Sequence, residues 1–182
     1  VAGATVRVTD DAEDLRAADR LVLPGVGAFG VAMDNLRSRG LDQALTEEVR
    51  AGAPFLGICL GMQLMAETST EHGEHRGLGW IPGSVERLTP TEEGERVPHV
   101  GWNEVHPEAD HPLFAGVEPD RDCYFVHGYA VRCTDRANVL ATTPYAGGFT
   151  SVIGTGTAVG VQFHPEKSQL AGRALLSNFL AL

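Results

Sequence analysis

The chain alternates short apolar runs with stripes of apolar residues at helical spacing. The runs at 20–23 and 54–58 have the length of buried strands. A short helix over 12–18, capped by polar residues at 9–11, precedes the first run. Between the runs, two stripes predict helices that pack on a core: Phe29, Met33 and Leu36, then Leu41, Ala44, Leu45 and Val49. Because strands alternate with helices, the pattern predicts an α/β fold with a mostly parallel central sheet and helices on its faces.

The pattern changes near residue 79, where short strands and turns replace the helices. Residues 122–133 predict one long strand, and a turn at 154–156 joins two further strands into a hairpin. At the N-terminal end, residues 4–8 follow Gly3 and predict a strand. A last helix is indicated by apolar residues at helical spacing: Ala171, Ala174, Leu175, Phe179 and Leu182.

One cysteine stands between the second apolar run and a helix-forming stretch. Cys59 is flanked by Gly57 and Gly61 and precedes a helix predicted over 60–68. This order is typical of a nucleophile on a sharp strand-to-helix turn, where a Cβ at either flank would collide with the neighbouring backbone. We expect the positive end of the helix to lower the pKa of the thiol. The alternative is a buried structural cysteine.

A histidine and a carboxylate near the other end could activate such a thiol. A strand-like run stops at His164, Pro165 blocks its continuation, and Glu166 follows. A thiol nucleophile needs a base, and the base needs a third group to fix its tautomer. Cys59, His164 and Glu166 could supply these roles, which predicts a cysteine hydrolase that acts on a small acyl substrate.

The loop PGVG at 24–27, after the first apolar run, is rich in exposed backbone N–H groups. It is either an ordinary turn between strand and helix or a loop that stabilises a negative oxygen during catalysis. The carboxyl ends of parallel strands meet at one edge of a sheet, so we expect Gly27 and Cys59 at the same edge.

The composition of the chain excludes some classes of partner and favours one cellular compartment. The 182 residues most simply form one domain, 1–182. A net charge of −10 argues against nucleic acid and anionic membranes, which attract cationic surfaces. No apolar stretch approaches the roughly 18 residues of a membrane span. The cysteines, Cys59, Cys123 and Cys133, show no paired spacing, which favours a reducing cytoplasm over a disulfide framework.

Several motifs identify a family that this sequence resembles. GICLGMQ at 57–63 and QFHPEKS at 162–168 resemble the two signatures of the triad, or class I, glutamine amidotransferases. Four further stretches resemble the glutaminase subunits of imidazole glycerol phosphate synthases: LPGVGAFG at 23–30, GLGWIPG at 77–83, VPHVGWN at 97–103 and YFVH at 124–127. The resemblance covers nearly the whole chain, and its motifs agree in order and spacing.

The resemblance implies a fold, a reaction and a partner. The fold would be a flavodoxin-like three-layer sandwich. The reaction would hydrolyse glutamine to glutamate and ammonia. The ammonia would pass to a (β/α)₈-barrel cyclase subunit in a heterodimer, which makes imidazole glycerol phosphate and aminoimidazole carboxamide ribotide in histidine biosynthesis. The resemblance implies no metal and no organic cofactor.

It also implies roles for residues outside the triad. The oxyanion hole would consist of three backbone amides, those of Val26, Gly27 and Leu60. The amino-acid end of glutamine would be held by Gln63, Gly128 and Tyr129. The subunit interface would include Trp102, Tyr124 and Lys167, although sequence context alone makes Trp102 a core aromatic. His127 is interpreted as a satisfied, partly buried histidine, and Gly128 stands where the family usually carries a small hydroxyl residue.

Two points set limits on the resemblance. In the family a strand, a glycine-containing loop and a helix precede the position of Val1, so this sequence is expected to be N-terminally truncated.

Three other functions also stay open. These are a glutaminase for another amidotransferase such as one for anthranilate, a cysteine peptidase or other hydrolase on a similar fold, and a truncated docking module without catalysis.

Overall fold

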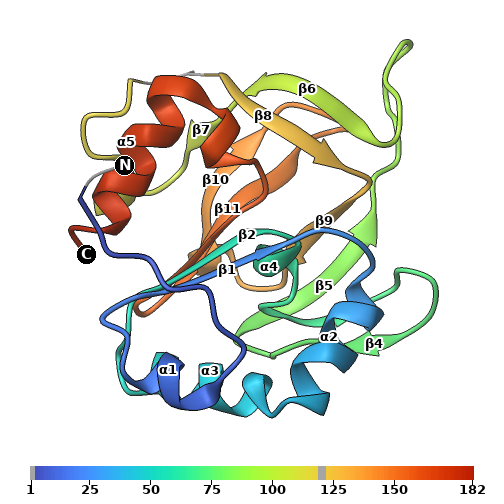
Figure 1. The fold of residues 1–182 in the computed structure, drawn as a ribbon. Helices are drawn as coiled ribbons and strands as arrows, with labels where there is room; N and C mark the ends of the chain where they lie inside the picture. Colours follow the sequence, from blue (N-terminus) through green and yellow to red (C-terminus); the bar gives the residue numbers. More distant parts are fainter. Residues whose placement is uncertain (1–2, 119–121) are drawn as a thin grey trace.

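The structure is a computed structural model that describes residues 3–118 and 122–182 (Figure 1). Its first elements are α1 (Ala12–Arg16), β1 (Leu21–Gly25), α2 (Phe29–Ser38), α3 (Leu41–Arg50), β2 (Phe55–Cys59), α4 (Leu60–Gln63), β3 (Ala66–Ser69), β4 (His75–Arg76) and β5 (Ile81–Arg87). The later ones are β6 (His99–Glu104), β7 (His106–Pro107), β8 (Asp122–His127), β9 (Tyr129–Cys133), β10 (Val139–Thr143), β11 (Phe149–Thr155), β12 (Ala158–Val161) and α5 (Gln169–Phe179). Short 3₁₀ turns lie at Pro112–Phe114, Arg136–Asn138 and Pro165–Lys167.

The largest sheet has the strand order β1-β2-β12-β11-β10-β7. β1, β2 and β12 run parallel, whereas β11, β10 and β7 are added antiparallel. The α/β class is therefore confirmed, but the sheet is mixed rather than mostly parallel. The predicted hairpin is the reason, because β11 and β12 are joined by a short turn and strands joined in this way must pair antiparallel.

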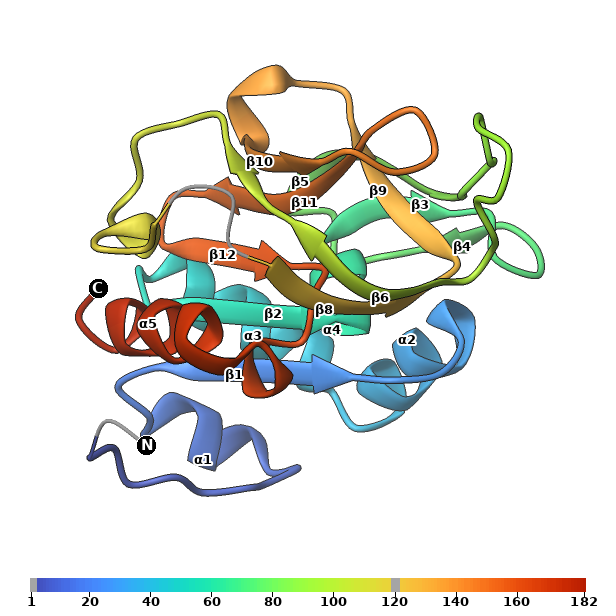
Figure 2. The same ribbon diagram turned by 90° about the horizontal axis from the view of Figure 1, so that it is seen from above.

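Two smaller sheets are built from the remaining strands, in the orders β4-β3-β5-β9 and β6-β8. They divide the long strand predicted over 122–133. Its first half, β8, pairs with β6, and its second half, β9, pairs with β5 (Figure 2). The division falls at Gly128, whose carbonyl accepts a hydrogen bond of 2.9 Å from the N–H of Leu88. The run forms two strands because its halves bond to different partners.

Helices lie on both faces of the largest sheet, with α5 on one side of β1 and β2 and with α2 and α3 on the other (Figure 1). On the first face, Leu175 of α5 packs in a core with Leu56. On the second, Met33 and Leu45 pack in a core with Phe55. Phe55 and Leu56 are neighbours in β2, and side chains alternate along a strand, so they enter opposite cores. This arrangement gives the three layers of the expected fold.

The helices before Cys59 are confirmed, whereas the strand predicted over residues 4–8 is wrong. The side chain of Asp11 accepts a 2.9 Å hydrogen bond from the N–H of Glu13 and so caps α1. Residues 4–8 are irregular, and Val6 and Val8 are exposed, because no strand in the described part of the chain pairs with them. In the two described ranges, no helix has both the length and the apolar character needed to cross a membrane.

Candidate active site

Cys59 is the last residue of β2 and directly precedes α4. Its φ of 54° and ψ of −109° lie outside the regions that residues with a side chain ordinarily adopt. Such a conformation costs roughly 1–3 kcal/mol and persists only where the surrounding structure enforces it. The sharp turn predicted at this cysteine is therefore present, and its strain distinguishes Cys59 from a cysteine that simply ends a buried strand.

The flanking glycines are required by contacts between backbones. A Cβ on Gly57 would lie 2.6 Å from the carbonyl oxygen of Gly61, and a Cβ on Gly61 would lie 1.8 Å from that of Leu23. The predicted collisions at both flanks are confirmed. The helix that follows is shorter than the predicted 60–68, because α4 ends at Gln63 and the chain then enters β3, which pairs with β5.

The thiol of Cys59 is buried in surroundings that favour its protonated form. Burial raises the pKa of the thiol above its ordinary value, and the negative charge of Glu166 acts in the same direction. Hydrogen bonds from the Leu60 amide and from Gln162, whose Nε2 lies 3.7 Å from Sγ, only partly oppose this rise. The expectation of a lowered pKa is wrong because α4 has only four residues and burial outweighs its dipole.

His164 follows β12 at the same edge of the sheet. Val161 of β12 is in register with Ile58 of β2, so the chain after Val161 continues beside the end of β2, where Cys59 lies. Nδ1 of His164 lies 2.7 Å from Oε1 of Glu166, and because a carboxylate only accepts, Nδ1 carries the proton. Nε2 is the ring nitrogen left to take up a proton from another group. It is buried, and none of the described residues gives it a hydrogen-bond partner.

Tyr124 and Ser168 hold the backbone of His164. The N–H of His164 donates to the carbonyl of Tyr124 at 2.9 Å. The hydroxyl of Ser168 donates to the carbonyl of His164 at 2.6 Å and accepts from the N–H of Tyr124 at 3.0 Å. Ser168 had no predicted role, and its only signal in the sequence was its place at the end of the QFHPEKS motif.

The glycine loop begins beside the cysteine. Gly25 of β1 is in register with Cys59, and a Cβ on Gly25 would lie 3.0 Å from Cβ of Leu60. Val26 is exposed, and Gly27 has a φ of 102°, which favours glycine. The loop therefore starts at the sheet edge where it was expected, and the oxyanion role of Val26, Gly27 and Leu60 stays a prediction.

The residues predicted to hold glutamine are linked to the thiol. Nε2 of Gln63 donates to the carbonyl of Tyr129 at 3.0 Å and to Oε1 of Gln162 at 3.0 Å. Gln162 in turn donates to Sγ of Cys59. Gly128 adjoins Tyr129 in the chain. Gln162 had no predicted role, because its contacts join positions far apart in the sequence.

Three predicted interface residues lie together. Trp102 and Tyr124 are opposite each other in the β6–β8 ladder, with ring centroids 5.8 Å apart, and Nζ of Lys167 lies 5.4 Å from the Tyr124 centroid. Trp102 is 46% exposed, so the core position suggested by its sequence context is wrong. It points outward because strand residues alternate. We call Val100, Trp102, Tyr124 and Val126 the outer face of the ladder.

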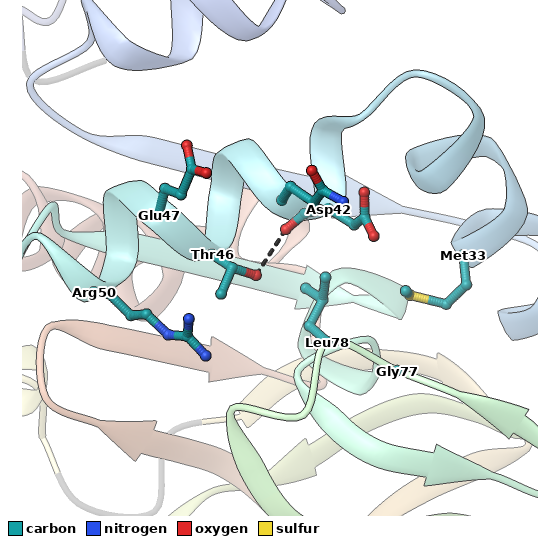
Figure 3. A pocket seen from close by; sticks show the side chains of 8 residues that line it. Met33, Asp42, Thr46, Glu47, Arg50, Gly77 and Leu78 are labelled. Atoms are coloured by element: carbon teal, nitrogen blue, oxygen red, sulfur yellow. Dashed lines mark hydrogen bonds between the residues drawn. The ribbon is translucent and has the colours of Figure 1, made fainter.

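Cys59 does not line either of two hollows in the described structure. One, of about 230 Å³, lies beside α3, and Thr46, Arg50 and Leu78 are among its lining residues (Figure 3). No predicted site residue lines it. The other, of about 310 Å³, is lined in part by Pro165 and Glu166 and so adjoins the histidine–carboxylate pair. Across the described ranges, no group of three or more metal-binding side chains gathers.

Comparison with known proteins identifies the class to which this fold and site belong. Residues 3–182 match the family model of glutamine amidotransferase class-I. The chain therefore belongs to the class-I glutamine amidotransferase family. A crystal structure of a glutamine amidotransferase superposes with a TM-score of 0.73 at 20% identity, covering 97% of this chain and 87% of that one, which agrees in fold.

Within that family, the chain is similar to proteins named imidazole glycerol phosphate synthase subunit HisH. The protein from Salinibacter ruber is 48% identical over 184 residues, which cover 99% of this chain and 84% of that protein. The one from Rhodospirillum rubrum is 49% identical over 180 residues, which cover 97% of this chain and 84% of that protein. The resemblance predicted from the motifs is thus confirmed.

Proposed function

We propose that this chain hydrolyses the side-chain amide of glutamine to glutamate and ammonia, with Cys59, His164 and Glu166 as its catalytic residues. One observation carries the proposal. A histidine whose Nδ1 is bonded to a carboxylate, and whose buried Nε2 has no hydrogen-bond partner among the described residues, lies at the same sheet edge as a cysteine held at positive φ. Membership of the class-I glutamine amidotransferase family supports this substrate.

The proposed reaction has two halves. In the first, Nε2 of His164 takes the proton of Cys59, and the thiolate attacks the amide carbon of glutamine. His164 then gives the proton to the leaving nitrogen, the C–N bond breaks, and a thioester remains while ammonia departs. In the second half, His164 removes a proton from water, which cleaves the thioester and restores the thiol. Glu166 orients the imidazole and stabilises its charged form.

The surrounding groups have proposed roles of their own. The developing oxyanion would accept hydrogen bonds from the backbone amides of Val26, Gly27 and Leu60. The start of this loop beside Cys59, in register with Gly25, supports the assignment. The amino-acid end of glutamine would be held by Gln63, Gly128 and Tyr129. Hydrogen bonds that already connect Gln63 to Tyr129 and, through Gln162, to the thiol support that second assignment.

We further propose that the ammonia passes directly to a (β/α)₈-barrel cyclase subunit. There it would be used to form imidazole glycerol phosphate and aminoimidazole carboxamide ribotide in histidine biosynthesis. The names of the similar proteins, which describe a synthase subunit, support this partner. The partner would dock on Trp102, Tyr124 and Lys167, because exposed aromatic residues are typical of interfaces. A partner carboxylate bound to Lys167 would act next to Glu166.

The isolated chain should be a weak glutaminase. Its Cys59 thiol has a raised pKa and therefore holds its proton at neutral pH. No described group hydrogen-bonds to Nε2 of His164, so the free chain has not yet engaged its base. Docking of the partner, loaded with its nucleotide ligand, would then complete the site.

The test is glutamate release from glutamine, measured with and without the cyclase subunit and its nucleotide ligand. We expect release that requires Cys59 and rises with the loaded partner. Cys59→Ala removes the nucleophile, and Cys133→Ala is the matched control, because that cysteine is free and has no proposed role. Full activity of the isolated chain, or activity that survives Cys59→Ala, would contradict the proposal.

Three outcomes separate the alternative functions. Ammonia transfer to the cyclase of histidine biosynthesis, and to no other amidotransferase partner, distinguishes this reaction from that of a related glutaminase. Labelling of Cys59 by a reactive glutamine analogue, without cleavage of peptides, excludes a cysteine peptidase. Binding to the cyclase without any glutamate release would identify a docking module.

We also propose that the chain works in the cytoplasm. Cys59, Cys123 and Cys133 are free thiols, and reducing compartments keep thiols in this form. Cell fractionation followed by detection of the chain tests this location. Recovery of the chain mainly from an oxidising compartment would contradict it.

A further inference from the structure

The β6–β8 ladder has an inner face that carries polar groups. On β6, Trp102 points outward while His99 and Asn103 point inward. On β8, His127 is the inward residue paired with His99. His99 is 3% exposed and His127 is 6% exposed, so both imidazoles are buried directly beneath the outer face of the ladder.

Their hydrogen bonds determine where the protons lie. Nδ1 of His127 lies 2.8 Å from the carbonyl of Tyr129, which only accepts, so Nδ1 of His127 is protonated and its Nε2 is bare. That Nε2 lies 3.1 Å from Nδ1 of His99, which must therefore donate. Nε2 of His99 then accepts from Nδ2 of Asn103 at 3.3 Å. Oδ1 of Asn103 accepts from the N–H of Glu104, which fixes the amide in this orientation.

The same chain of bonds continues to the thiol. The carbonyl of Tyr129, which accepts from His127, also accepts from Nε2 of Gln63 at 3.0 Å. The second N–H of Gln63 donates to Oε1 of Gln162, and Gln162 donates to Sγ of Cys59. An unbroken series of hydrogen bonds therefore joins a strand of the outer face to the proposed nucleophile.

We propose that His99 and His127 are positioning residues: as neutral, Nδ1-protonated imidazoles they fix the carbonyl of Tyr129 and, through Gln63 and Gln162, the site around the Cys59 thiol. This inference rests on the proposed glutaminase function and names residues that tune the same site. It also gives β6 a route by which a change at the outer face reaches the glutamine site.

We call the series of hydrogen bonds from Asn103 through His99, His127, the Tyr129 carbonyl, Gln63 and Gln162 to the Cys59 thiol the relay. The relay positions groups and cannot conduct a proton. Its donors point from Asn103 through His99 and His127 toward the carbonyl of Tyr129, whereas Gln63 donates to that carbonyl from the other side. The direction of donation thus reverses at Tyr129, so no proton can hop from the histidines to the thiol.

Protonation of either imidazole would break the relay. A proton on Nε2 of His127 would face the N–H of His99, so two donors would meet. The charged or titratable groups that face His127 are His99 and His164, both of which disfavour its positive charge. Those that face His99 are His127, at 3.1 Å, Glu95, which favours a positive charge, and Tyr145, whose ring stacks on it with centroids 3.9 Å apart. Burial holds both histidines neutral.

Amide substitutions test the two ends of each ring separately. An Asn side chain places its amide near the Nδ1 position, whereas the longer Gln places its amide near Nε2. In the full chain with its cyclase partner, we expect His127→Asn to keep the donor to Tyr129 and most of the glutaminase rate. His127→Gln should lower kcat about tenfold, which is the value of one lost hydrogen bond. The kcat of His99→Asn, which keeps its donor to His127, should likewise exceed the kcat of His99→Gln.

A purely structural role predicts the opposite order, because Asn fills less of the buried space than Gln and leaves the larger cavity. The free energy of unfolding, measured for the same four variants, separates folding from positioning. Equal rates for Asn and Gln at both positions, or Gln faster than Asn, would overturn the relay.

A second readout is independent of activity. The ¹⁵N spectrum of the imidazole rings in the folded chain should show His99 and His127 neutral and protonated at Nδ1 at neutral pH. Rings that are charged, or protonated at Nε2, would overturn the relay whatever the rates. A wild-type complex that releases no glutamate would overturn the proposed function and the positioning role together. Normal wild-type release with no Asn–Gln difference would overturn the positioning role alone.

Discussion

The main-chain carbonyl of Tyr124 accepts a 2.9 Å hydrogen bond from the N–H of His164. The side chain of Tyr124 lies on the outer face of the ladder, next to Trp102 and Lys167. A single residue therefore contacts both the surface proposed for the partner and the backbone of the proposed base. A shift of β8 caused at the surface would reach His164 without passing through any other side chain.

Ser168→Ala should loosen this attachment. The substitution removes the donor to the His164 carbonyl and the acceptor of the Tyr124 N–H. The Tyr124 N–H is then left unpaired, and the His164 carbonyl keeps only the 3.0 Å hydrogen bond from the N–H of Lys167. We expect the free energy of unfolding to fall by about 1–3 kcal/mol and kcat to fall about tenfold. Denaturant unfolding and glutamate release measure the two effects.

Ser151→Ala is the matched control for Ser168→Ala. The Ser151 hydroxyl is buried and has no hydrogen-bond partner among the described residues. Its removal leaves nothing newly unpaired, so stability should stay the same or rise. Equal losses of stability and of kcat in the two alanine variants would show that the hydroxyl of Ser168 does not hold His164 and Tyr124 in place.

The folded chain should lose stability in mild acid. Burial lowers the pKa of His127 from the ordinary 6.5 to about 4, and burial also lowers the pKa of His99 to about 4. Between these values the unfolded chain binds more protons than the folded one, so the free energy of unfolding falls as pH drops from 6.5 toward 4. His127 alone should contribute about 3 kcal/mol of this loss.

Denaturant midpoints measured across that pH window test the prediction. His127→Asn should flatten the dependence, because it removes one of the two histidines whose pKa burial lowers to about 4. A midpoint that does not change between these pH values would contradict the buried, neutral state of both rings.

Gly128→Ser should improve glutamine binding. A Cβ on Gly128 would lie 3.5 Å from Cγ1 of Val97 and 3.9 Å from Cβ of Pro98, which are ordinary contacts. The added hydroxyl restores the group that the resembled family usually carries here, so we expect a lower KM for glutamine. Gly128→Ala gives the same backbone effect, a gain of about 0.4–1 kcal/mol in stability, without the hydroxyl. The same KM in both variants would exclude a hydroxyl contact.

Alkylation of Cys59 should be slow in the isolated chain at neutral pH. The thiolate is the reactive form, and the pKa of this thiol lies above its ordinary value of 9.0 because of burial. The rate should therefore climb as pH rises past 9.0, and the loaded partner should raise it at neutral pH. Site-resolved mass spectrometry after iodoacetamide treatment measures the alkylation rate of Cys59. Fast modification of Cys59 in the isolated chain at neutral pH would contradict the buried, protonated state.

Gly61→Ala should prevent the elbow from closing. The new Cβ would lie 1.8 Å from the carbonyl oxygen of Leu23, and a backbone group inside a sheet cannot swing aside. We expect the free energy of unfolding to fall by about 3 kcal/mol or more, or the protein not to fold at all. Gly156→Ala is the control, since its φ is 54° and nothing lies within 4 Å of its Cβ position, so only the cost of the left-handed backbone, about 1–2 kcal/mol, should appear. Equal stability of the two variants would rule out the collision.

Local patterns explain which features the sequence could predict. The elbow at Cys59 depends on glycines two positions away on either side, and His164 and Glu166 are two residues apart, so each is visible in a short window. The stripe of Phe29, Met33 and Leu36 likewise predicts α2, because helical spacing is a property of neighbouring residues.

Features that depend on distant contacts could not be predicted in this way. Gln162 reaches Cys59 across 103 positions, and Ser168 reaches Tyr124 across 44. The outward direction of Trp102 depends on which face of β6 packs inward. The pKa of Cys59 depends on how deeply the fold buries it, and no motif states that depth.

The β6–β8 ladder carries its surface and its relay on opposite sides of the same two strands. Side chains along a strand alternate with a period of two, so inserting one residue into β6 between His99 and Trp102 would place both side chains on the same side of the ladder. Inserting two residues would keep the original sides. The spacing between these two residues can therefore vary only in even steps, and an insertion series between His99 and Trp102 should alternately lose and retain the combination of partner binding and glutaminase activity.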